Sequence, residues 1–190
     1  MVLERNEREV VAACRRGDAE AFHALFETYQ DRVYSIALRY SGDATQALDI
    51  SQEVFLKLLS SIGEFRGEAN FETWLFRMVV NRCLDHHRRS RRWLPVVADL
   101  VNRIWAPGET VLHRMLRNEV ETKVQDVVAT LSPEQRVVVV LRYTEGLSYE
   151  QIAEILGCTT GTVGSRLNRA HKVLERRLAH LRRGEGGVRG

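Results

Sequence analysis

The sequence predicts an all-α protein made of two small helical domains joined by a linker, the C-terminal one containing a helix-turn-helix. Three observations support this prediction. The 190 residues include only three prolines, no run of alternating β-branched residues stands out, and apolar residues recur at helical spacing between capping residues. A hydrophobic content of 44% supports packed cores in a chain of this length.

The first domain is expected over residues 1–94, as helices separated by short loops. Asp18 can cap one helix, which Gly42 ends, and Asp43 can cap the next. Asn70 then begins a long helix that finishes in the basic run HHRRSRR. The stretch GEFRGEAN in front of that helix contains two glycines and is predicted to be a loop.

Residues 95–115 are predicted to connect the two domains, although their composition is not that of a typical linker. Val97, Val101 and Trp105 lie at helical spacing, so this segment can form an amphipathic helix. Because burial of these side chains is favourable, we hypothesise that the segment docks on its own domains or on an inhibitory partner.

The second domain is expected over residues 116–183, followed by a disordered tail at 184–190. Two of its helices begin with capping boxes, SPEQ and SYEQ, in which serine and glutamine are three residues apart. Gly146 and Gly157 end the helices that follow these boxes.

The stretch LSYEQIAEILGCTTGTVGSRLNRAHK fits a helix-turn-helix. Ala153 is small where the two helices would cross, and Gly157 tolerates the positive φ that the turn needs. A shared apolar seam can form from Ile152, Leu156, Val163 and Leu167. The second helix would then present its other face to the major groove of DNA. This combination favours DNA binding over a plain amphipathic hairpin.

Charge is segregated along the chain, although the net charge is only +3. Residues 1–70 carry −4, 71–103 carry +4, 104–157 carry −3 and 158–190 carry +6. This alternation fits two separate contacts with a polyanion such as nucleic acid, and leaves acidic faces for another partner. From charge alone, patchy solvated faces of a helical protein are an equal alternative.

The cysteines and the apolar segments narrow the class of protein. Cys14, Cys83 and Cys158 are far apart and form no CxxC pair, so we expect reduced thiols, no zinc site and no disulfide. No apolar run approaches about 18 residues, and the N-terminus lacks an apolar signal core. The prediction is a cytoplasmic protein without membrane insertion. His86 and His87 are adjacent and point about 100° apart on a helix, which disfavours a metalloenzyme.

Two sets of residues resemble extracytoplasmic-function (ECF) sigma factors of the sigma-70 family. SYEQIAEILGCTTGTVGSRLNRAHKVL resembles their DNA-binding region, whereas DISQEVFLKL and FRGEANFETWLFRMVVNRCLDHHRR resemble their first conserved domain. Both sets occur in the family's order, and the resemblance covers about residues 8–180. It implies a factor that directs core RNA polymerase to promoters and initiates transcription, and that is not an enzyme.

The resemblance also implies the partners. The first domain would bind the clamp helices of core RNA polymerase and the non-template strand of the −10 promoter element. The second would bind the −35 duplex and the polymerase flap. An anti-sigma factor, which can hold such a protein at the membrane, is the expected regulator, and no cofactor or metal is implied.

The same resemblance assigns roles to individual residues. Contacts to core polymerase are predicted for Asp49, Gln52, Glu53 and Phe55. Contacts to the −10 strand are predicted for Phe65, Arg66, Glu68, Ala69, Asn70, Arg77, Asn81, Arg88 and Arg89. Contacts to the −35 element are predicted for Thr160, Thr162, Gly164, Ser165, Arg166, Asn168, Arg169 and Lys172.

Gly164 departs from the family, which usually has Lys or Arg at this position. One hypothesis is that the missing side chain changes which −35 bases are read; the other is that the position is merely tolerant. A stand-alone helix-turn-helix regulator is the alternative for the whole protein. Such a regulator would bind its duplex alone, whereas a sigma factor needs core polymerase.

Overall fold

A computed structural model describes residues 2–67, 69–92 and 119–184 of the chain. The N-terminal helices are α1 (Val2–Arg15), α2 (Ala19–Ser41), α3 (Ala44–Ser61), the short 3-10 turn η1 (Ile62–Glu64) and α4 (Phe71–Arg92). The C-terminal helices are α7 (Glu119–Ala129), α8 (Pro133–Tyr143), α9 (Tyr149–Leu156) and α10 (Thr160–Gly184). These described residues contain no strand, which confirms the all-α fold class.

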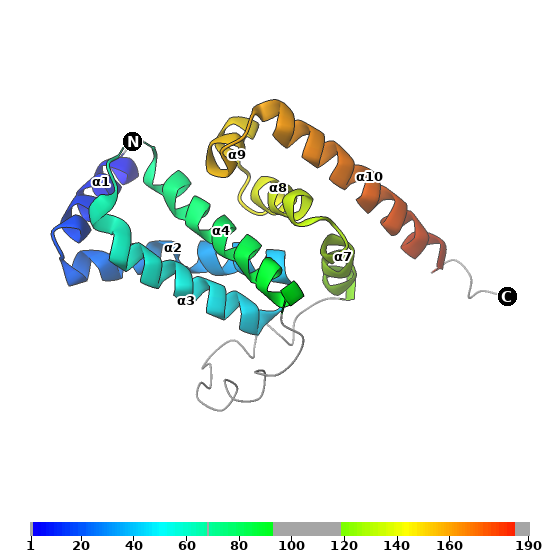
Figure 1. Cartoon of the computed structure of the whole chain (residues 1–190), viewed down its shortest axis with the longest axis horizontal. Helices are drawn as coiled ribbons and strands as arrows, with labels where there is room; N and C mark the ends of the chain where they lie inside the picture. Colours follow the sequence, from blue (N-terminus) through cyan, green and yellow to red (C-terminus); the bar gives the residue numbers. More distant parts are fainter. Residues whose placement is uncertain (1, 68, 93–118, 185–190) are drawn as a thin grey trace.

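The helices form two groups that lie side by side (Figure 1). In the first group, α1 crosses one end of α2, while α3 and α4 pack along α2. In the second group, α8 lies between α7 and α9, and the long helix α10 runs across the outside. The two groups touch mainly where α4 meets α9 and where α2 meets α8.

Local capping explains where several helices begin and end. The Asp18 carboxylate accepts hydrogen bonds from two backbone N–H groups of α2, and the Asp43 carboxylate accepts one at the start of α3. Both predicted capping boxes form, at Ser132 and at Ser148. Gly157 ends α9 with φ at 61°, a left-handed conformation that glycine adopts without steric cost.

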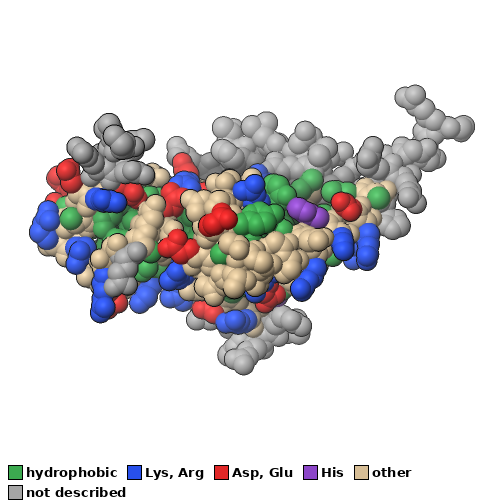
Figure 2. Space-filling model, turned by 90° about the horizontal axis from the view of Figure 1, so that it is seen from above, with side chains coloured by type: hydrophobic (Ala, Val, Ile, Leu, Met, Phe, Trp, Pro, Cys, Tyr) green, Lys and Arg blue, Asp and Glu red, His purple; other side chains and the backbone are tan. Residues whose placement is uncertain are grey.

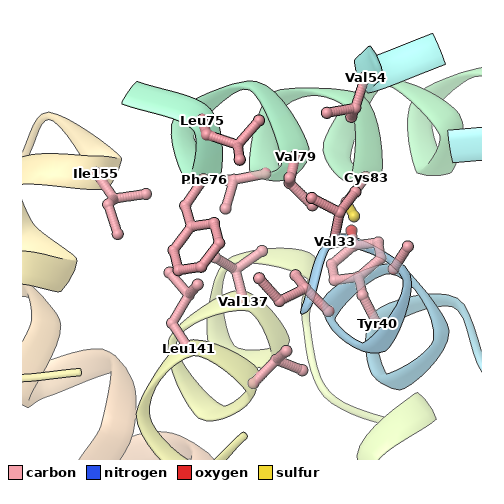
Figure 3. Close-up of a cluster of buried hydrophobic side chains, with 14 of the residues drawn as sticks. Val33, Tyr40, Val54, Leu75, Phe76, Val79, Cys83, Val137, Leu141 and Ile155 are labelled. Carbon is pink, nitrogen blue, oxygen red and sulfur yellow. The ribbon is translucent and has the colours of Figure 1, made fainter. Parts of the chain in front are cut away.

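One hydrophobic core runs through both groups of helices. Phe76 on α4 is fully buried, and in Figure 3 its ring points toward Leu141 on α8, with Ile155 on α9 nearby. Val33 and Tyr40 on α2 lie close to Cys83 on the other side of the same core. The two groups are therefore docked through buried side chains, not merely tethered.

Polar contacts reinforce this docking. The guanidinium of Arg136 is buried on α8 and donates to the carbonyl oxygen of Tyr40 on α2 at 3.0 Å. The side chain of Gln125 on α7 donates to the carbonyl oxygens of Leu38 and Arg39, at 3.2 and 2.7 Å. The expected docking of the linker, residues 95–115, lies outside the described residues.

Candidate polymerase and nucleic-acid interfaces

Helix α3 carries the residues predicted to bind core polymerase, and the structure separates them. Asp49 and Gln52 are exposed. Glu53 is half-buried and lies 3.5 Å from both Arg82 and His86 on α4, so its carboxylate is already paired. Phe55 is only 8% exposed, and its ring centroid lies 4.6 Å from that of Phe26. Phe55 therefore belongs to the core and does not share the exposed face.

Two apolar residues on the exposed face of α3 were not among the residues predicted to bind core polymerase. Leu56 and Leu59 are 67% and 57% exposed, the two most exposed of the large aliphatic side chains in the described part of the chain. They continue the face of Gln52 at helical spacing, four and seven residues further on. The spacing of these leucines is visible in the sequence, but the sequence does not show that no other helix of the described part of the chain covers them.

The loop predicted to bind the −10 strand partly encloses a hollow of about 590 Å³. Phe65, Ala69 and Asn70 line it, so the structure brings these three predicted residues together. The Asn70 side-chain oxygen accepts a hydrogen bond from the backbone N–H of Glu72 at 3.1 Å and so caps α4. Arg66 is exposed beside them, whereas Glu68 lies outside the described residues.

The other predicted −10 residues follow α4. Arg77, Asn81 and Arg88 are exposed and recur at helical spacing, so they form a stripe along the helix. The Nη2 of Arg77 donates to the carbonyl oxygen of Glu154 on α9 at 2.7 Å. This predicted DNA contact is therefore engaged by the other group of helices. The side chain of Arg89 lies outside the described residues.

Helix α10 presents most of the predicted −35 residues. The exposed ones are Thr160, Ser165, Asn168, Arg169 and Lys172. Thr162 and Arg166 are half-buried, and the Thr162 hydroxyl lies 3.0 Å from that of Thr159, the residue before α10. The exposed members offer hydroxyl, amide and guanidinium groups of the kind that contact base edges and phosphates.

Gly164 faces the first helix of the helix-turn-helix. A Cβ at this position would lie 3.6 Å from the Cε2 atom of Tyr149, an ordinary van der Waals contact. Gly164, Gly161 and Thr160 also line a shallow hollow beside Tyr149. A methyl group therefore fits at position 164, whereas a longer side chain must pass the Tyr149 ring.

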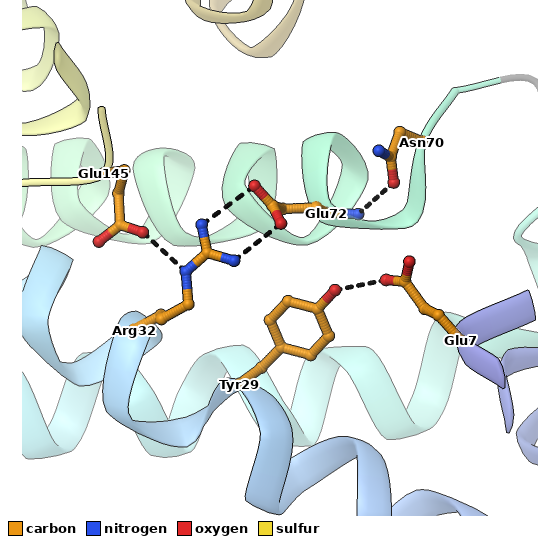
Figure 4. Close-up of polar contacts among 6 residues, drawn as sticks. All are labelled: Glu7, Tyr29, Arg32, Asn70, Glu72 and Glu145. Atoms are coloured by element: carbon orange, nitrogen blue, oxygen red, sulfur yellow. Dashed lines mark hydrogen bonds and ion pairs between the residues drawn. The ribbon is translucent and has the colours of Figure 1, made fainter. Parts of the chain in front are cut away.

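An ion-pair cluster that the sequence did not predict joins the two groups of helices (Figure 4). The Arg32 guanidinium donates to both carboxylate oxygens of Glu72, at 2.7 and 3.0 Å, and to Glu145 at 2.8 Å. It also lies 4.8 Å from the centroid of the Phe76 ring. Burial works to lower the pKa of Arg32, but these two carboxylates raise it overall, so the side chain stays charged.

Charge on the surface is uneven. Viewed from above, Lys and Arg side chains gather near the α1 end of the molecule and over the C-terminal half of α10, with Asp and Glu prominent between them (Figure 2). In the described part of the chain, no group of three or more His, Cys, Asp or Glu side chains could hold a metal ion. No helix there is both long and apolar enough to cross a membrane.

Two family patterns match the chain. Sigma-70 region 2 matches residues 25–93, and Sigma-70 region 4 matches residues 121–174. The RNA polymerase sigma-H factor of Pseudomonas aeruginosa is 34% identical over 193 residues, which cover 96% of this chain and 99% of that protein. The ECF RNA polymerase sigma-E factor of Haemophilus influenzae is 34% identical over 191 residues, covering 95% of this chain and 100% of that protein.

Two solved structures share the fold. CnrH, in complex with the cytosolic domain of CnrY, superimposes with a TM-score of 0.70 at 22% identity, covering 92% of this chain and 97% of that one. RpoE of Bartonella quintana, in complex with the anti-sigma factor NepR, superimposes with a TM-score of 0.65 at 23% identity, covering 85% and 98%.

Proposed function

This chain belongs to the ECF group of the sigma-70 family of RNA polymerase sigma factors. We therefore propose which of its surfaces bind core polymerase and which bind promoter DNA when it directs core polymerase to promoters. In the proposal, residues 1–94 bind the polymerase clamp helices and the −10 element. Residues 116–183 bind the −35 element and the polymerase flap, and residues 95–115 tether the two. The protein itself catalyses no step.

The surface that carries this proposal is the exposed face of α3. Asp49 and Gln52 supply polar groups, and Leu56 and Leu59 supply apolar area that no described part of the chain covers. Exposed apolar side chains beside polar groups are typical of protein interfaces. We therefore assign the clamp-helix contact to these four residues. Phe55 supports the face from the core, and Glu53 holds α3 to α4.

A single substitution tests this assignment. Leu56→Asp should weaken the affinity for core polymerase by about tenfold or more, because burying a leucine is worth about 1.5–3 kcal/mol. The matched control is Ala24→Asp, at an exposed position of α2, which should leave that affinity unchanged. Fluorescence anisotropy with labelled protein and core polymerase measures both. Equal affinities for Leu56→Asp and wild type would remove α3 from the interface.

The proposed DNA contacts follow the two other surfaces. The non-template −10 strand would bind the loop from Phe65 to Asn70 and the Arg77 and Asn81 stripe, where an unpaired base can enter a pocket. The −35 duplex would bind the exposed residues of α10.

Gly164→Arg should change the affinity for −35 DNA or its sequence preference. Unchanged affinity and preference in a binding assay with randomised duplexes would mean that position 164 is merely tolerant.

Regulation by an anti-sigma factor completes the proposal. The similarity in fold to RpoE of Bartonella quintana, which was solved with the anti-sigma factor NepR, supports a partner of this kind. The site of action would be the cytoplasm, where core polymerase works, with membrane attachment only through that partner. Fractionation of the source cells, with core polymerase as the cytoplasmic marker, tests this location. Persistence in the membrane fraction without any bound partner would contradict it.

A further inference from the structure

A histidine in the charged cluster between α3 and α4 has no role in the polymerase and DNA contacts proposed above. Asp49 and Glu53 lie four residues apart on α3, and Arg82 and His86 lie four residues apart on α4. The two helices pack side by side (Figure 1). The carboxylate of Glu53 lies 3.5 Å from Arg82 Nη1 and 3.5 Å from His86 Nε2. His86 therefore borders the face of α3 that we assign to core polymerase.

We propose that His86 is a positioning residue whose proton competes with core polymerase for the carboxylates of Asp49 and Glu53. A protonated imidazole draws these carboxylates toward α4. A neutral imidazole leaves Asp49 to pair with a basic group of the polymerase. This inference rests on the proposed role of α3 as the polymerase contact, and it adds a dependence of that contact on pH.

The imidazole is placed so that its proton changes its contacts. The His86 side chain is 23% exposed, and its Nε2 atom is buried without a hydrogen-bond partner in the described part of the chain. A neutral ring with its proton on Nδ1 turns a lone pair toward the Glu53 carboxylate, whereas a proton on Nε2 turns a donor toward it. Because a buried polar atom without a partner costs free energy, this site favours the charged ring while both carboxylates stay close.

Asp49 supplies the second carboxylate. It is exposed one turn before Glu53, on the same side of α3. Partial burial raises the pKa of Asp49, and the charge on His86 is the largest influence that lowers it. The neighbouring carboxylates of Glu53 and Asp43 raise the pKa further by repulsion. A positive charge on His86 therefore relieves the crowding of negative charge along this side of α3.

The other charged and titratable groups around the cluster do not change charge near neutral pH. Arg82, one turn earlier on α4, shares the Glu53 carboxylate and stays protonated as arginines do. Asp85 is paired with Arg88 at 3.4 Å. Tyr40, on the adjoining helix α2, has a pKa that burial raises above its ordinary value, so its hydroxyl stays neutral. Histidine, by contrast, is the residue type that changes charge between about pH 5 and 8.

The direction of the pH dependence follows from proton linkage. Charge complementarity across an interface means that Asp49 selects a basic group on its partner. Once Asp49 has paired with that group, it no longer favours the proton on His86, so complex formation releases protons. Binding should therefore tighten as the pH rises from about 6 to about 8. The dissociation constant should fall about two- to fivefold, equivalent to roughly 0.5–1 kcal/mol for a partly exposed ion pair.

The test measures the affinity of the full chain for core polymerase across this pH range at constant ionic strength. Fluorescence anisotropy with labelled protein reports the dissociation constant. His86→Gln keeps hydrogen-bonding groups but has no titrating proton, so its affinity should stay level near the wild-type value at about pH 8. His86→Lys carries a permanent charge, so its affinity should stay level near the weaker wild-type value at about pH 6.

The control is His23→Gln, which removes a histidine on α2 whose side chain is 72% exposed. It should keep the wild-type change in affinity with pH, and it accounts for any titration of core polymerase itself. A wild-type affinity that does not change with pH would overturn the inference, as would an unchanged profile in His86→Gln. Loss of binding by His86→Gln at every pH would overturn it too, because His86 would then be purely structural. If the wild-type chain binds core polymerase at no pH, the proposed role of α3 fails first.

Discussion

Gly164 and Gly157 lie close together in the helix-turn-helix, yet only Gly157 has a backbone conformation that disfavours other residues. Gly157 ends α9 with φ at 61°, a conformation in which a Cβ is strained. Gly164 lies inside α10 and carries no positive φ, and a Cβ there would meet only the Tyr149 ring at 3.6 Å. The backbone therefore favours glycine at position 157 but not at position 164.

The same substitution at these two positions should have opposite effects. Gly164→Ala should raise the free energy of unfolding by about 0.5–1 kcal/mol, because alanine favours a helix interior over glycine. Gly157→Ala should lower it by about 1–2 kcal/mol, because alanine is strained at that φ. Urea unfolding followed by circular dichroism measures both. Destabilisation by Gly164→Ala would show that α10 cannot accept a methyl group beside Tyr149.

At the scale of one element, α3 has a buried face and an exposed face on neighbouring residues. Phe55→Ala should cost about 3–5 kcal/mol of stability, because it opens a cavity next to Phe26. Leu56→Ala should change stability by less than about 0.5 kcal/mol, since that side chain is mostly exposed. Thermal unfolding of both variants checks this. A large loss of stability for Leu56→Ala would mean that Leu56 is covered in the free protein.

The starts of the helices could be predicted from the sequence, whereas the exposure of their apolar faces could not. Helix starts at Asp18, Asp43, Ser132 and Ser148 were predictable because each cap binds backbone groups within three residues. The exposure of Leu56 was not, because periodicity marks an apolar stripe but not how much of it a distant helix covers. The packing of α2 and α4 against α3 determines which of its side chains remain exposed.

At the scale of the whole molecule, the docking of the two groups of helices bears on function. Elements at −35 and −10 lie about 25 base pairs apart, or about 85 Å of B-form DNA. In the docked arrangement Arg77, which we propose as a contact to the −10 strand, is hydrogen-bonded to α9 of the helix-turn-helix. We therefore expect the two groups to separate when the factor engages polymerase and promoter.

The ion pair between Arg32 and Glu145 should stabilise the docked arrangement. Cys83 on α4 can report on this docking, because it lies beside Val137 and Leu141 of α8. Burial raises the pKa of Cys83 to about 12, so its thiol stays unreactive while α4 is docked on α8. Glu145→Gln should speed alkylation of Cys83 by roughly tenfold, equivalent to about 1.4 kcal/mol of docking free energy. Mass spectrometry identifies the labelled cysteine. The control Glu150→Gln, at an exposed position of α9, should leave the rate unchanged, and equal rates for all variants would contradict this account.

Docking could not be predicted from the sequence because its contacts are far apart along the chain. Arg32 and Glu145 are 113 residues apart, and Gln125 lies 86 residues from Arg39. Neither pair belongs to a local motif, and both depend on how complete helices pack. The helix-turn-helix seam, by contrast, was predictable because it lies within one short stretch. Of its four predicted residues, Ile152, Val163 and Leu167 are buried in the structure and Leu156 is half-buried.

Run-off transcription with core RNA polymerase from the same organism, on a pool of its genomic DNA, tests most directly whether this protein selects promoters. We expect discrete transcripts that depend on this protein and whose start sites share two upstream sequence elements. Absence of such transcripts, together with no measurable binding to core polymerase by the purified chain, would contradict this role.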